Sequence, residues 1–577
     1  MKLKIVLPYF LFLVSGHLSA CKKTAHENPA PPTPPSQDTT VVTPKDPETA
    51  GTIGFFMNEW RPVTFTAPEF TEGAVSSSAN VMVDVDASTI VTKIPRTLFG
   101  NNANLWMGQF VTEPALMNHI SNLHPKIIRF PGGSISDVFF WNAANRQKLI
   151  DAPDSLTQAN GKNIAGGYWY GKNNDSWTCS VDNYYNMLQQ TGNEGMITIN
   201  YGYARYGTSA DPVAVAAHLA ADWVRYDNGK TKYWEIGNEN NGDWEAGYRI
   251  DVSVNKDGQP EIITGELYGK HVKVFTDSMK KAAQEIGKTI YIGAQLIEHQ
   301  PESWETSTTK NWNAGVLPQL VNAADFYIVH NYYTPYNTNS TAIDILKSAS
   351  SATQKMSDYL SQSITSAGAL IKPYALTEYN IFATGSQQMV SHTAGMHAVM
   401  VLNELMRNKF GEASRWDLAN GWDNGNDHGL FNNGDEPGAA KWNPRPAFYY
   451  LYYLQKTIGD RFINSTVTGS ADVVSYASTY SSGQVQVTLV NKSTTAKDVQ
   501  LSFKNFYPAN RFYWYTLEGG DSGAEFSRKV LVNGQGPTGV SGGPGNYTSL
   551  KAYSATVRNG VKVSVPARGV VYVVVDK

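Results

Sequence analysis

The chain has 577 residues, 41% of them hydrophobic, which is enough for a large core and for more than one domain. Its formal net charge of −3 offers no electrostatic attraction to nucleic acid, so we expect no partner of that class. Aromatic residues make up 12% of the chain, with 14 Trp and 32 Tyr. This surplus favours a surface that stacks on sugar faces, although the same residues also fill cores.

The first residues are typical of a bacterial lipoprotein signal peptide, which we predict over residues 1–21. Two lysines precede the apolar run Ile5–Val14, which is too short for a stable membrane span, and Leu-Ser-Ala then leads into Cys21. This order resembles the lipobox, in which the cysteine is lipidated; the alternative is a plain secreted protein. We therefore expect an exported protein anchored to a membrane by Cys21, at the outer membrane, the cell surface or the periplasmic face.

Residues 22–55 are rich in Pro and Thr and predict an extended linker. Between residues 56 and 95, the alternating run Val81–Val85 predicts N-terminal strands that join a C-terminal sheet. The only other cysteine is Cys179, so the mature chain forms no internal disulfide. We expect a monomer.

From residue 96 to residue 457, short apolar runs alternate with amphipathic stretches. The expected strands are Leu98–Gly100, Lys126–Phe130, Gly195–Asn200, Lys232–Ile236, Ile290–Ala294, Phe326–His330, Tyr374–Thr377 and Arg415–Leu418. The clearest helical stretches are Pro212–Tyr226, Glu266–Ile286, Ala342–Ser366 and Met389–Lys409. Eight strands alternating with helices predict an α/β fold, the (β/α)8 TIM barrel. An open parallel sheet would be expected to carry a Gly-rich phosphate turn, and none is seen.

Residues 458–577 change in character, with β-branched runs such as Gln484–Val490 and Val570–Val575 between Gly, Ser and Asn. This pattern predicts a C-terminal antiparallel β-sandwich.

Two glutamates follow barrel strands that face one another across the barrel mouth. Glu239 comes after the fourth strand beside Asn238, and Glu378 comes after the seventh, in Thr-Glu-Tyr-Asn. Catalytic groups of such barrels lie at the carboxyl ends of the strands. Glycoside hydrolysis needs two carboxyl groups, one to protonate the leaving oxygen and one to attack or to activate water. The alternative is that both are solvated loop residues.

The segment Tyr233–Trp244, which contains Gly-Asn-Glu, is similar to the strand-four segment of family 51 α-L-arabinofuranosidases in glycoside hydrolase clan A. The strand-seven motif resembles their nucleophile segment, with Thr and Tyr where Asp and Trp are commoner. The resemblance implies a retaining enzyme that works by double displacement through a glycosyl-enzyme intermediate. It makes Glu239 the acid/base and Glu378 the nucleophile, and it implies that Asn238 donates a hydrogen bond to the 2-hydroxyl of the substrate.

Further positions fit this resemblance. Arg129 matches the clan's buried arginine beside the nucleophile, and the following Pro-Gly-Gly is a turn that lets backbone approach a ligand. His330 resembles the clan's His-x-Tyr histidine and is expected to contact a hydroxyl; Tyr332 or Tyr333 is expected to bind the nucleophile. Trp422 lies where many clan members stack an indole on the sugar. For Arg129, His330 and Trp422, a purely structural role is the alternative.

The segment Asp423–His428 alternates oxygen side chains that could ligate Ca²⁺, but it lacks the glutamate of an EF-hand loop, and an active-site loop is favoured. No Cys/His cluster has zinc spacing, and the reaction needs no cofactor.

We therefore expect a glycosidase acting on a carbohydrate substrate, a plant or algal polysaccharide or its oligosaccharides, in the manner of an α-L-arabinofuranosidase. A β-agarase, endo-xylanase or β-glucanase of the same clan is the alternative, because the two glutamates determine the reaction and not the sugar. A non-catalytic surface glycan-binding lipoprotein is the alternative from another class, and it would not need both carboxylates.

Overall fold

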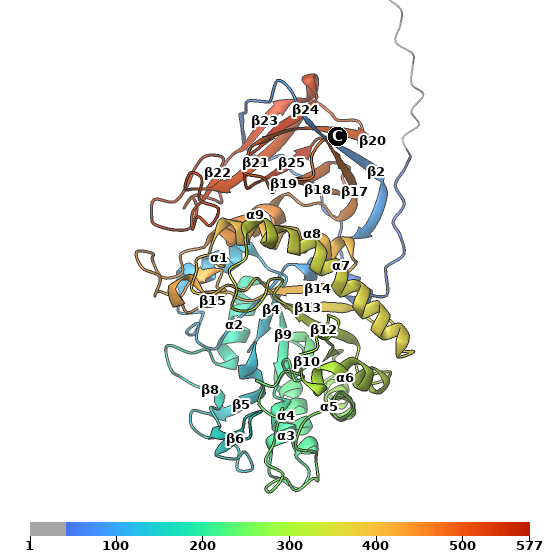
Figure 1. Cartoon of the computed structure of the whole chain (residues 1–577), viewed down its shortest axis with the longest axis vertical. Coiled ribbons are helices and arrows are strands. Elements are labelled where there is room, and N and C mark those ends of the chain that lie inside the picture. The colour runs from blue at the N-terminus through green and yellow to red at the C-terminus, as the bar shows by residue number, and fades with distance from the viewer. Residues whose placement is uncertain (1–41) are drawn as a thin grey trace, which may run out of the picture. The chain divides into compact units, whose positions relative to one another are not determined.

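The computed structural model describes residues 42–577, and eight parallel strands within it close into a barrel. In chain order these are β3 (Gly100–Asn102), β4 (Ile127–Phe130), β9 (Glu194–Ile199), β10 (Thr231–Ile236), β11 (Tyr291–Gln295), β12 (Phe326–Asn331), β13 (Tyr374–Tyr379) and β14 (Glu412–Arg415). They pair in that order and β14 pairs back with β3, which confirms the predicted TIM barrel (Figure 1).

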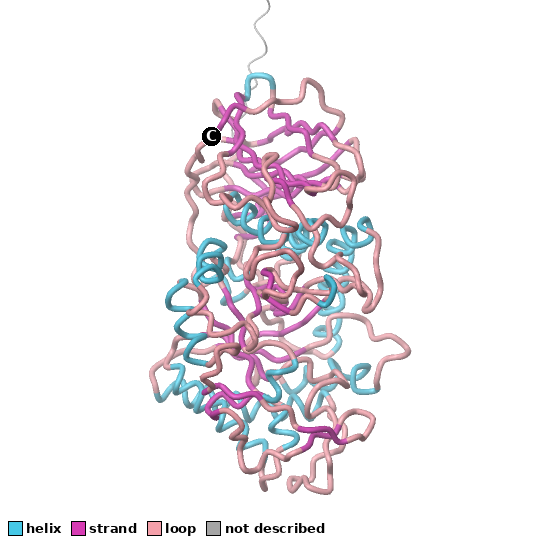
Figure 2. Tube along the Cα trace, turned by 90° about the vertical axis from the view of Figure 1, so that its left-hand side faces the viewer, coloured by secondary structure: helices cyan, strands magenta, loops and turns pink. Residues whose placement is uncertain are grey.

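A helix follows each barrel strand, as parallel neighbours require. The helices are α1 (Pro114–Leu123), α2 (Val181–Thr191), α3 (Gly202–Tyr206) and α4 (Pro212–Asp227) together, α5 (Gly265–Glu285), α6 (Ser307–Val316), α7 (Ala342–Ser366), α8 (His392–Arg407) and α9 (Pro446–Thr457). Several begin at a side-chain cap: Ser180, Asp211, Thr264, Thr341 and Ser391 each accept a hydrogen bond from a backbone N–H of the first turn. In Figure 2 these helices surround the strands.

The first and eighth strands differ from the prediction. Arg96–Leu98 is a 3-10 turn, so the first strand begins at Gly100 instead of Leu98. The eighth strand is Glu412–Arg415, which ends where the predicted one began. Three of its four residues, Glu-Ala-Ser-Arg, are polar, yet all four are buried, and the Ser414 hydroxyl donates to Glu412 Oε1 at 2.6 Å.

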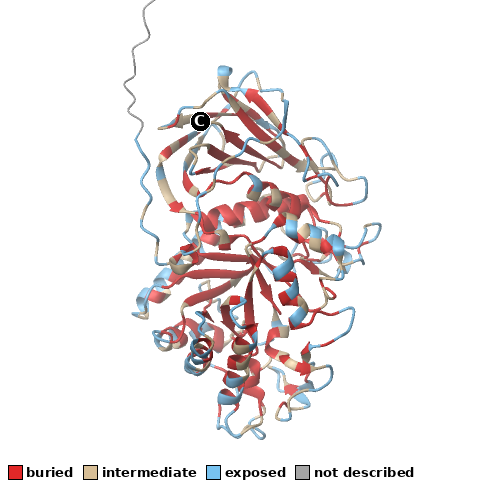
Figure 3. Ribbon diagram, turned by 180° about the vertical axis from the view of Figure 1, so that it is seen from behind, coloured by how far each residue is buried: buried red, intermediate tan, exposed pale blue. Residues whose placement is uncertain are grey.

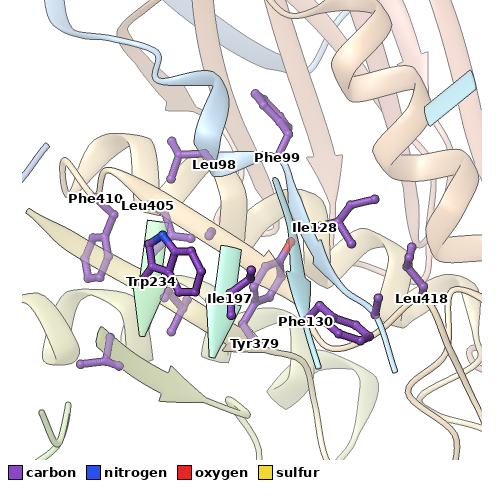
Figure 4. Packing of buried hydrophobic residues seen from close by; sticks show 14 of the residues in the cluster. Leu98, Phe99, Ile128, Phe130, Ile197, Trp234, Tyr379, Leu405, Phe410 and Leu418 are labelled. Carbon is purple, nitrogen blue, oxygen red and sulfur yellow. The ribbon is translucent and has the colours of Figure 1, made fainter. Parts of the chain in front are cut away.

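Apolar side chains fill the space between the barrel strands and the surrounding helices. Figure 4 shows Ile128, Ile197 and Trp234 of neighbouring strands facing the same cluster as Leu405 of α8. The strands are buried almost throughout (Figure 3). This packing holds the strand ends rigidly in place, and rigid strand ends are what a catalytic site needs.

The amino ends of the strands are closed by a segment for which the sequence predicted a linker. Ile53 and the 3-10 turn Gly54–Met57 pack against Tyr233 and Phe326, with the Phe56 and Phe326 ring centroids 5.6 Å apart. The Pro/Thr-rich composition therefore gives way to folded structure before residue 55.

Eleven further strands form one sheet around a core of its own. They are β1 (Phe70–Glu72), β2 (Val81–Lys93), β17 (Arg461–Thr468), β18 (Val473–Thr479), β19 (Val485–Asn491), β20 (Lys497–Lys504), β21 (Arg511–Gly519), β22 (Val530–Val532), β23 (Ala552–Thr556), β24 (Val561–Val565) and β25 (Gly569–Val575). The sheet is mostly antiparallel, as expected, but β1–β23 and β2–β20 are parallel pairs because strands from before the barrel enter it.

Short strands lie in the long connections at the barrel mouth. They are β5 (Phe139–Ala144), β6 (Ser155–Thr157), β7 (Asn163–Ala165), β8 (Trp169–Lys172), β15 (Ala419–Asn420) and β16 (Phe431–Asn432). Within residues 42–577, none of the helices combines the length and apolar character that a membrane span requires. Cys21, the predicted lipidation site, lies outside the described residues.

Candidate active site

The two predicted carboxylates meet at the carboxyl ends of β10 and β13. Glu239 is the third residue after β10, and Glu378 is the penultimate residue of β13. One oxygen of each carboxylate and one ring nitrogen of His330 all lie within 4.8 Å of one another. Retaining glycosidases hold their carboxyl groups about 5–5.5 Å apart, and inverting ones about 6.5–9.5 Å apart. The separation is therefore that of a retaining pair.

A tight turn after β10 directs Glu239 into the site. Gly237 has φ 75°, and a Cβ atom there would lie 2.0 Å from the Asn240 side-chain oxygen, so only glycine fits. Glu239 itself has φ 43°, an uncommon conformation for a residue with a side chain, which is held in place by its surroundings.

Glu378 is buried, and each of its oxygens receives a charged or hydroxyl donor. Arg129 Nη1 donates to Oε1 at 2.7 Å, and the Tyr332 hydroxyl donates to Oε2 at 2.8 Å. Burial alone would lower the pKa of Arg129, but the charges of Glu235 and Glu378 outweigh it and raise that pKa. A permanent positive charge therefore faces the carboxylate, and its two oxygens have fixed orientations.

The structure decides between the two tyrosines after β12. Tyr332 binds Glu378, whereas the Tyr333 hydroxyl pairs with Thr353 Oγ1 of α7 at 2.9 Å. The alternative that the sequence left open is thus resolved in favour of Tyr332.

Glu239 has different partners and is less buried. His330 Nδ1 lies 2.8 Å from Oε1, and Trp244 Nε1 donates to Oε2 at 3.1 Å. Burial opposes the charged carboxylate, but the hydrogen bond and the charge of His330 outweigh it and lower the pKa of Glu239. Burial also opposes the imidazolium, but the charges of Glu378 and Glu239 raise the pKa of His330. Both shifts favour the ion pair of a charged imidazole and a carboxylate at this contact.

His330 is fixed from its other side by Thr377. Its Nε2 lies 3.0 Å from the Thr377 hydroxyl, at the position where the strand-seven motif departs from the commoner Asp. His330 thus contacts the acid/base candidate in this structure, in addition to any contact with a sugar hydroxyl.

Asn238 is held by Arg129, which the sequence motifs indicated, and by Glu245, which they did not. Its side-chain oxygen accepts from Arg129 Nη2 at 2.9 Å, and its amide nitrogen donates to Glu245 Oε1 at 3.1 Å. Burial, followed by the nearby charge of Asp137, raises the pKa of Glu245 well above its ordinary value. Glu235 is a further missed residue: it lies on β10 and pairs with Arg129 inside the barrel. Buried acids within strands resemble core positions in sequence, so only their partners reveal them.

Among the described residues, Trp422 contacts two arginines and not the carboxylate pair. The guanidinium carbons of Arg445 and Arg528 lie 5.7 and 5.2 Å from its ring centroid. Trp416 instead is the tryptophan directly after β14, and its ring fills the space beside Gly133, where an added Cβ would lie 2.7 Å from it. The predicted Pro-Gly-Gly turn therefore makes room for an indole. Trp416 was overlooked because the eighth strand was predicted three residues too late.

The segment Asp423–His428 is occupied by protein groups. Asp427 pairs with Arg445 at 2.7 Å and accepts the Gly429 N–H at 2.7 Å, while His428 Nε2 lies 3.2 Å from the Ile381 carbonyl. A guanidinium holds the one buried carboxylate of this segment, which favours the active-site loop over a cation site.

Glu239, His330 and Glu378 also have the spacing of a metal site among the described residues. However, Arg129 and Tyr332 already donate to both oxygens of Glu378. A guanidinium beside a carboxylate repels a divalent cation, so the donor set fits acid–base chemistry better than metal binding.

Comparisons with known proteins agree with this geometry. Residues 119–346 match the family described as "Alpha-L-arabinofuranosidase 1 domain". A curated "Intracellular exo-alpha-(1->5)-L-arabinofuranosidase" from Bifidobacterium longum is 23% identical over 292 residues, 46% of this chain and 44% of that protein. The chain thus matches less than half the length of this relative.

Solved structures share the fold. The GH51 α-L-arabinofuranosidase from Thermotoga petrophila has a TM-score of 0.59 at 16% identity, over 86% of this chain and all of that one. A family 44 xyloglucanase from Paenibacillus polymyxa has a TM-score of 0.55 at 12% identity, over 86% of this chain and 99% of that one. These matches agree with the resemblance carried by the sequence motifs: residues 119–346 are similar to the alpha-L-arabinofuranosidase 1 domain, and the barrel has a fold that solved family 51 structures share.

Proposed function

We propose that the protein is a retaining glycoside hydrolase of the α-L-arabinofuranosidase type. The observation that carries this proposal is the separation of the Glu239 and Glu378 carboxylates, whose nearest oxygens lie within 4.8 Å. The family match supports the sugar type, because it covers the strands that carry Arg129, Glu239 and His330. A non-catalytic glycan-binding protein would have no need of this buried, hydrogen-bonded pair.

The geometry supplies a role for each group in double displacement. Glu378, aimed by Arg129 and Tyr332, attacks the anomeric carbon while Glu239 gives a proton to the leaving oxygen. Water, deprotonated by Glu239, then cleaves the glycosyl-enzyme ester and releases Glu378. The Glu239 proton comes from the pair that it forms with His330.

Asn238 completes the site in this proposal. Its amide nitrogen has two hydrogens, and Glu245 takes one of them. The other remains for the 2-hydroxyl of the sugar, a contact that strengthens in the transition state.

The test is a stereochemical one. We expect the protein to hydrolyse 4-nitrophenyl α-L-arabinofuranoside, and NMR of the first product should show the α-anomer before mutarotation. A first-formed β-anomer would overturn the retaining mechanism. Release of sugar from xylosides or galactosides alone, with none from arabinofuranosides, would favour another specificity of the same clan.

The predicted membrane anchor is a separate proposal and rests on the sequence around Cys21. We expect the full-length protein to be found in the membrane fraction of a bacterial host, and Cys21→Ser to release it. Equal partitioning of both proteins would contradict lipidation at this cysteine.

A further inference from the structure

A cavity of about 300 Å³ opens beside Glu239. We call it the acid-side cavity; its walls are Glu239 and His330, with Asp243 and Trp244 from the loop after β10, and Glu298, His299, Trp304 and Glu305 from the loop after β11. Among the described residues that line it, Glu239 is present and Glu378 is not. In double displacement the acid contacts the leaving oxygen and the nucleophile contacts the sugar under attack. A cavity that starts at the acid therefore lies on the side of the leaving group.

Two indoles in this cavity are unusually exposed. Trp304 is 80% exposed and Trp244 is 64% exposed. Large aromatic surfaces open to water inside a cavity indicate a binding site, since each loses contact with water when a ligand covers it. An indole presents a flat apolar face, which suits the C–H face of a sugar ring. The hydrogen bond from Trp244 to Glu239 places one of these faces next to the proton donor.

The polar residues of the cavity carry an excess of negative charge. His299 lies between two carboxylates, with Nδ1 3.3 Å from Glu298 Oε1 and Nε2 2.9 Å from Glu305 Oε1. Asp243 adds a third carboxylate, and no Lys or Arg is among the described lining residues. Lys310 binds the Ser303 carbonyl on the same loop, outside the lining. The three carboxylates accept hydrogen bonds from hydroxyl groups, and together they leave the wall with a net negative charge that repels anions.

We propose that the acid-side cavity binds the leaving-group sugar and selects a neutral sugar over a uronic acid or sulfated one. This inference rests on the proposed function, because it assigns the leaving group to the side of Glu239. In this proposal Trp304 stacks on the face of the leaving-group sugar. Asp243 and Glu305 repel sugars that carry a negative charge.

The cavity can be tested by transfer of the glycosyl group to two matched acceptors. The donor is 4-nitrophenyl α-L-arabinofuranoside, and the acceptors are methyl β-D-galactopyranoside and methyl β-D-galactopyranosiduronate, which differ only in an anionic C6 carboxylate. In the transfer step the ester bond to Glu378 breaks, the acceptor oxygen bonds to the anomeric carbon, and its proton goes to Glu239. The ratio of transfer product to free arabinose reports how well each acceptor occupies the cavity.

We expect the neutral acceptor to give about tenfold more transfer product than the uronate, which corresponds to about 1.4 kcal/mol. Trp304→Ala should reduce transfer to the neutral acceptor about fivefold. The double variant Asp243→Asn/Glu305→Gln should raise transfer to the uronate. The neutral acceptor should then exceed the uronate in transfer product by less than in the wild type. Leu370→Ala removes another exposed apolar side chain, next to the amino end of β13, and should leave the ratio unchanged. Equal transfer to both acceptors would overturn the proposal. So would a ratio of transfer product to free arabinose, measured with the neutral acceptor, that Trp304→Ala leaves unchanged.

A binding measurement separates this proposal from the proposed function. Tryptophan fluorescence is titrated with each galactoside in the absence of donor, so that no turnover is needed. Quenching by the neutral sugar alone, lost in Trp304→Ala, supports the cavity even in a protein that leaves the donor intact. Absence of quenching, or equal quenching by both sugars, overturns the cavity proposal whether or not the donor is cleaved.

Discussion

The ends of β10 and β13 each present one glutamate, yet their surroundings differ. Glu378 is buried between a guanidinium and a tyrosine hydroxyl, which hold it as a fixed anion. Glu239 adopts an uncommon backbone conformation, lies beside an open cavity and contacts His330 at 2.8 Å. A nucleophile must be aimed and charged, whereas an acid/base must gain and lose a proton in each cycle. In the proposed mechanism, two identical side chains thus acquire different roles from their neighbours.

We expect the largest effect from removal of the Glu378 carboxylate. Glu378→Ala is expected to lower kcat at least about 10⁴-fold with any leaving group, because no covalent intermediate can form. Sodium azide should then restore some turnover with inversion, since it takes the place of the carboxylate. Activity within tenfold of the wild type would remove Glu378 from the nucleophile role.

Glu239→Ala should show a loss that depends on the leaving group. For an arabino-oligosaccharide, whose leaving hydroxyl needs a proton, we expect a loss of about 10²–10⁴-fold. With 4-nitrophenol as leaving group, the intermediate should still form and accumulate as a burst. Azide should give a product of retained configuration. If both substrates lose activity equally in the first step, Glu239 is not the acid.

Tyr332→Phe tests the hydroxyl that aims Glu378. The loss of one hydrogen bond to a charged group should lower kcat/KM about 10–100-fold. Tyr333→Phe is the matched control, because its hydroxyl binds Thr353 instead, and it should stay close to the wild type in activity. The prediction fails if the two variants behave alike.

His330→Gln tests the histidine beside the proposed acid. Against the effect of burial, the hydrogen bond and the charge of His330 lower the pKa of Glu239. Without them the pKa of Glu239 should rise, so the alkaline limb of the kcat/KM profile, which reports the acid of the free enzyme, should move to higher pH. An alkaline limb that stays in place or moves to lower pH would show that His330 does not lower the pKa of Glu239.

The smallest effect concerns the charged wall of the acid-side cavity. The hydrogen bond to Glu298 helps to raise the pKa of His299 to about 9, so its contribution to stability is complete below pH 6.5 and is lost as pH rises through 9. Because His299 is partly exposed, we expect His299→Gln to cost less than about 1 kcal/mol at pH 6. Urea unfolding at pH 6 and pH 10 measures the free energy of unfolding of both proteins. The difference between variant and wild type should be smaller at pH 10, and a difference that grows with pH would contradict this pairing.

Part of the site was predictable because short motifs follow strands in a regular order. Glu239, Asn238 and Glu378 stand at strand ends that alternation of apolar runs and helices locates well. Glu235, Glu245 and Trp416 were missed, since each looks like a core residue or a loop residue until its partner is known. The predicted position of the eighth strand is wrong because this strand is buried although three of its four residues are polar, so an apolar pattern does not reveal it.

The sequence by itself determined the order of elements, the carboxylate pair and the change from barrel to sheet, because these follow from local periodicity and from motifs. Only the tertiary structure decided which tyrosine binds Glu378, that His330 contacts Glu239, and that the loops after β10 and β11 line a common cavity. Those features depend on distances between residues far apart in the chain. Barrel closure sets these distances, and no local pattern records them.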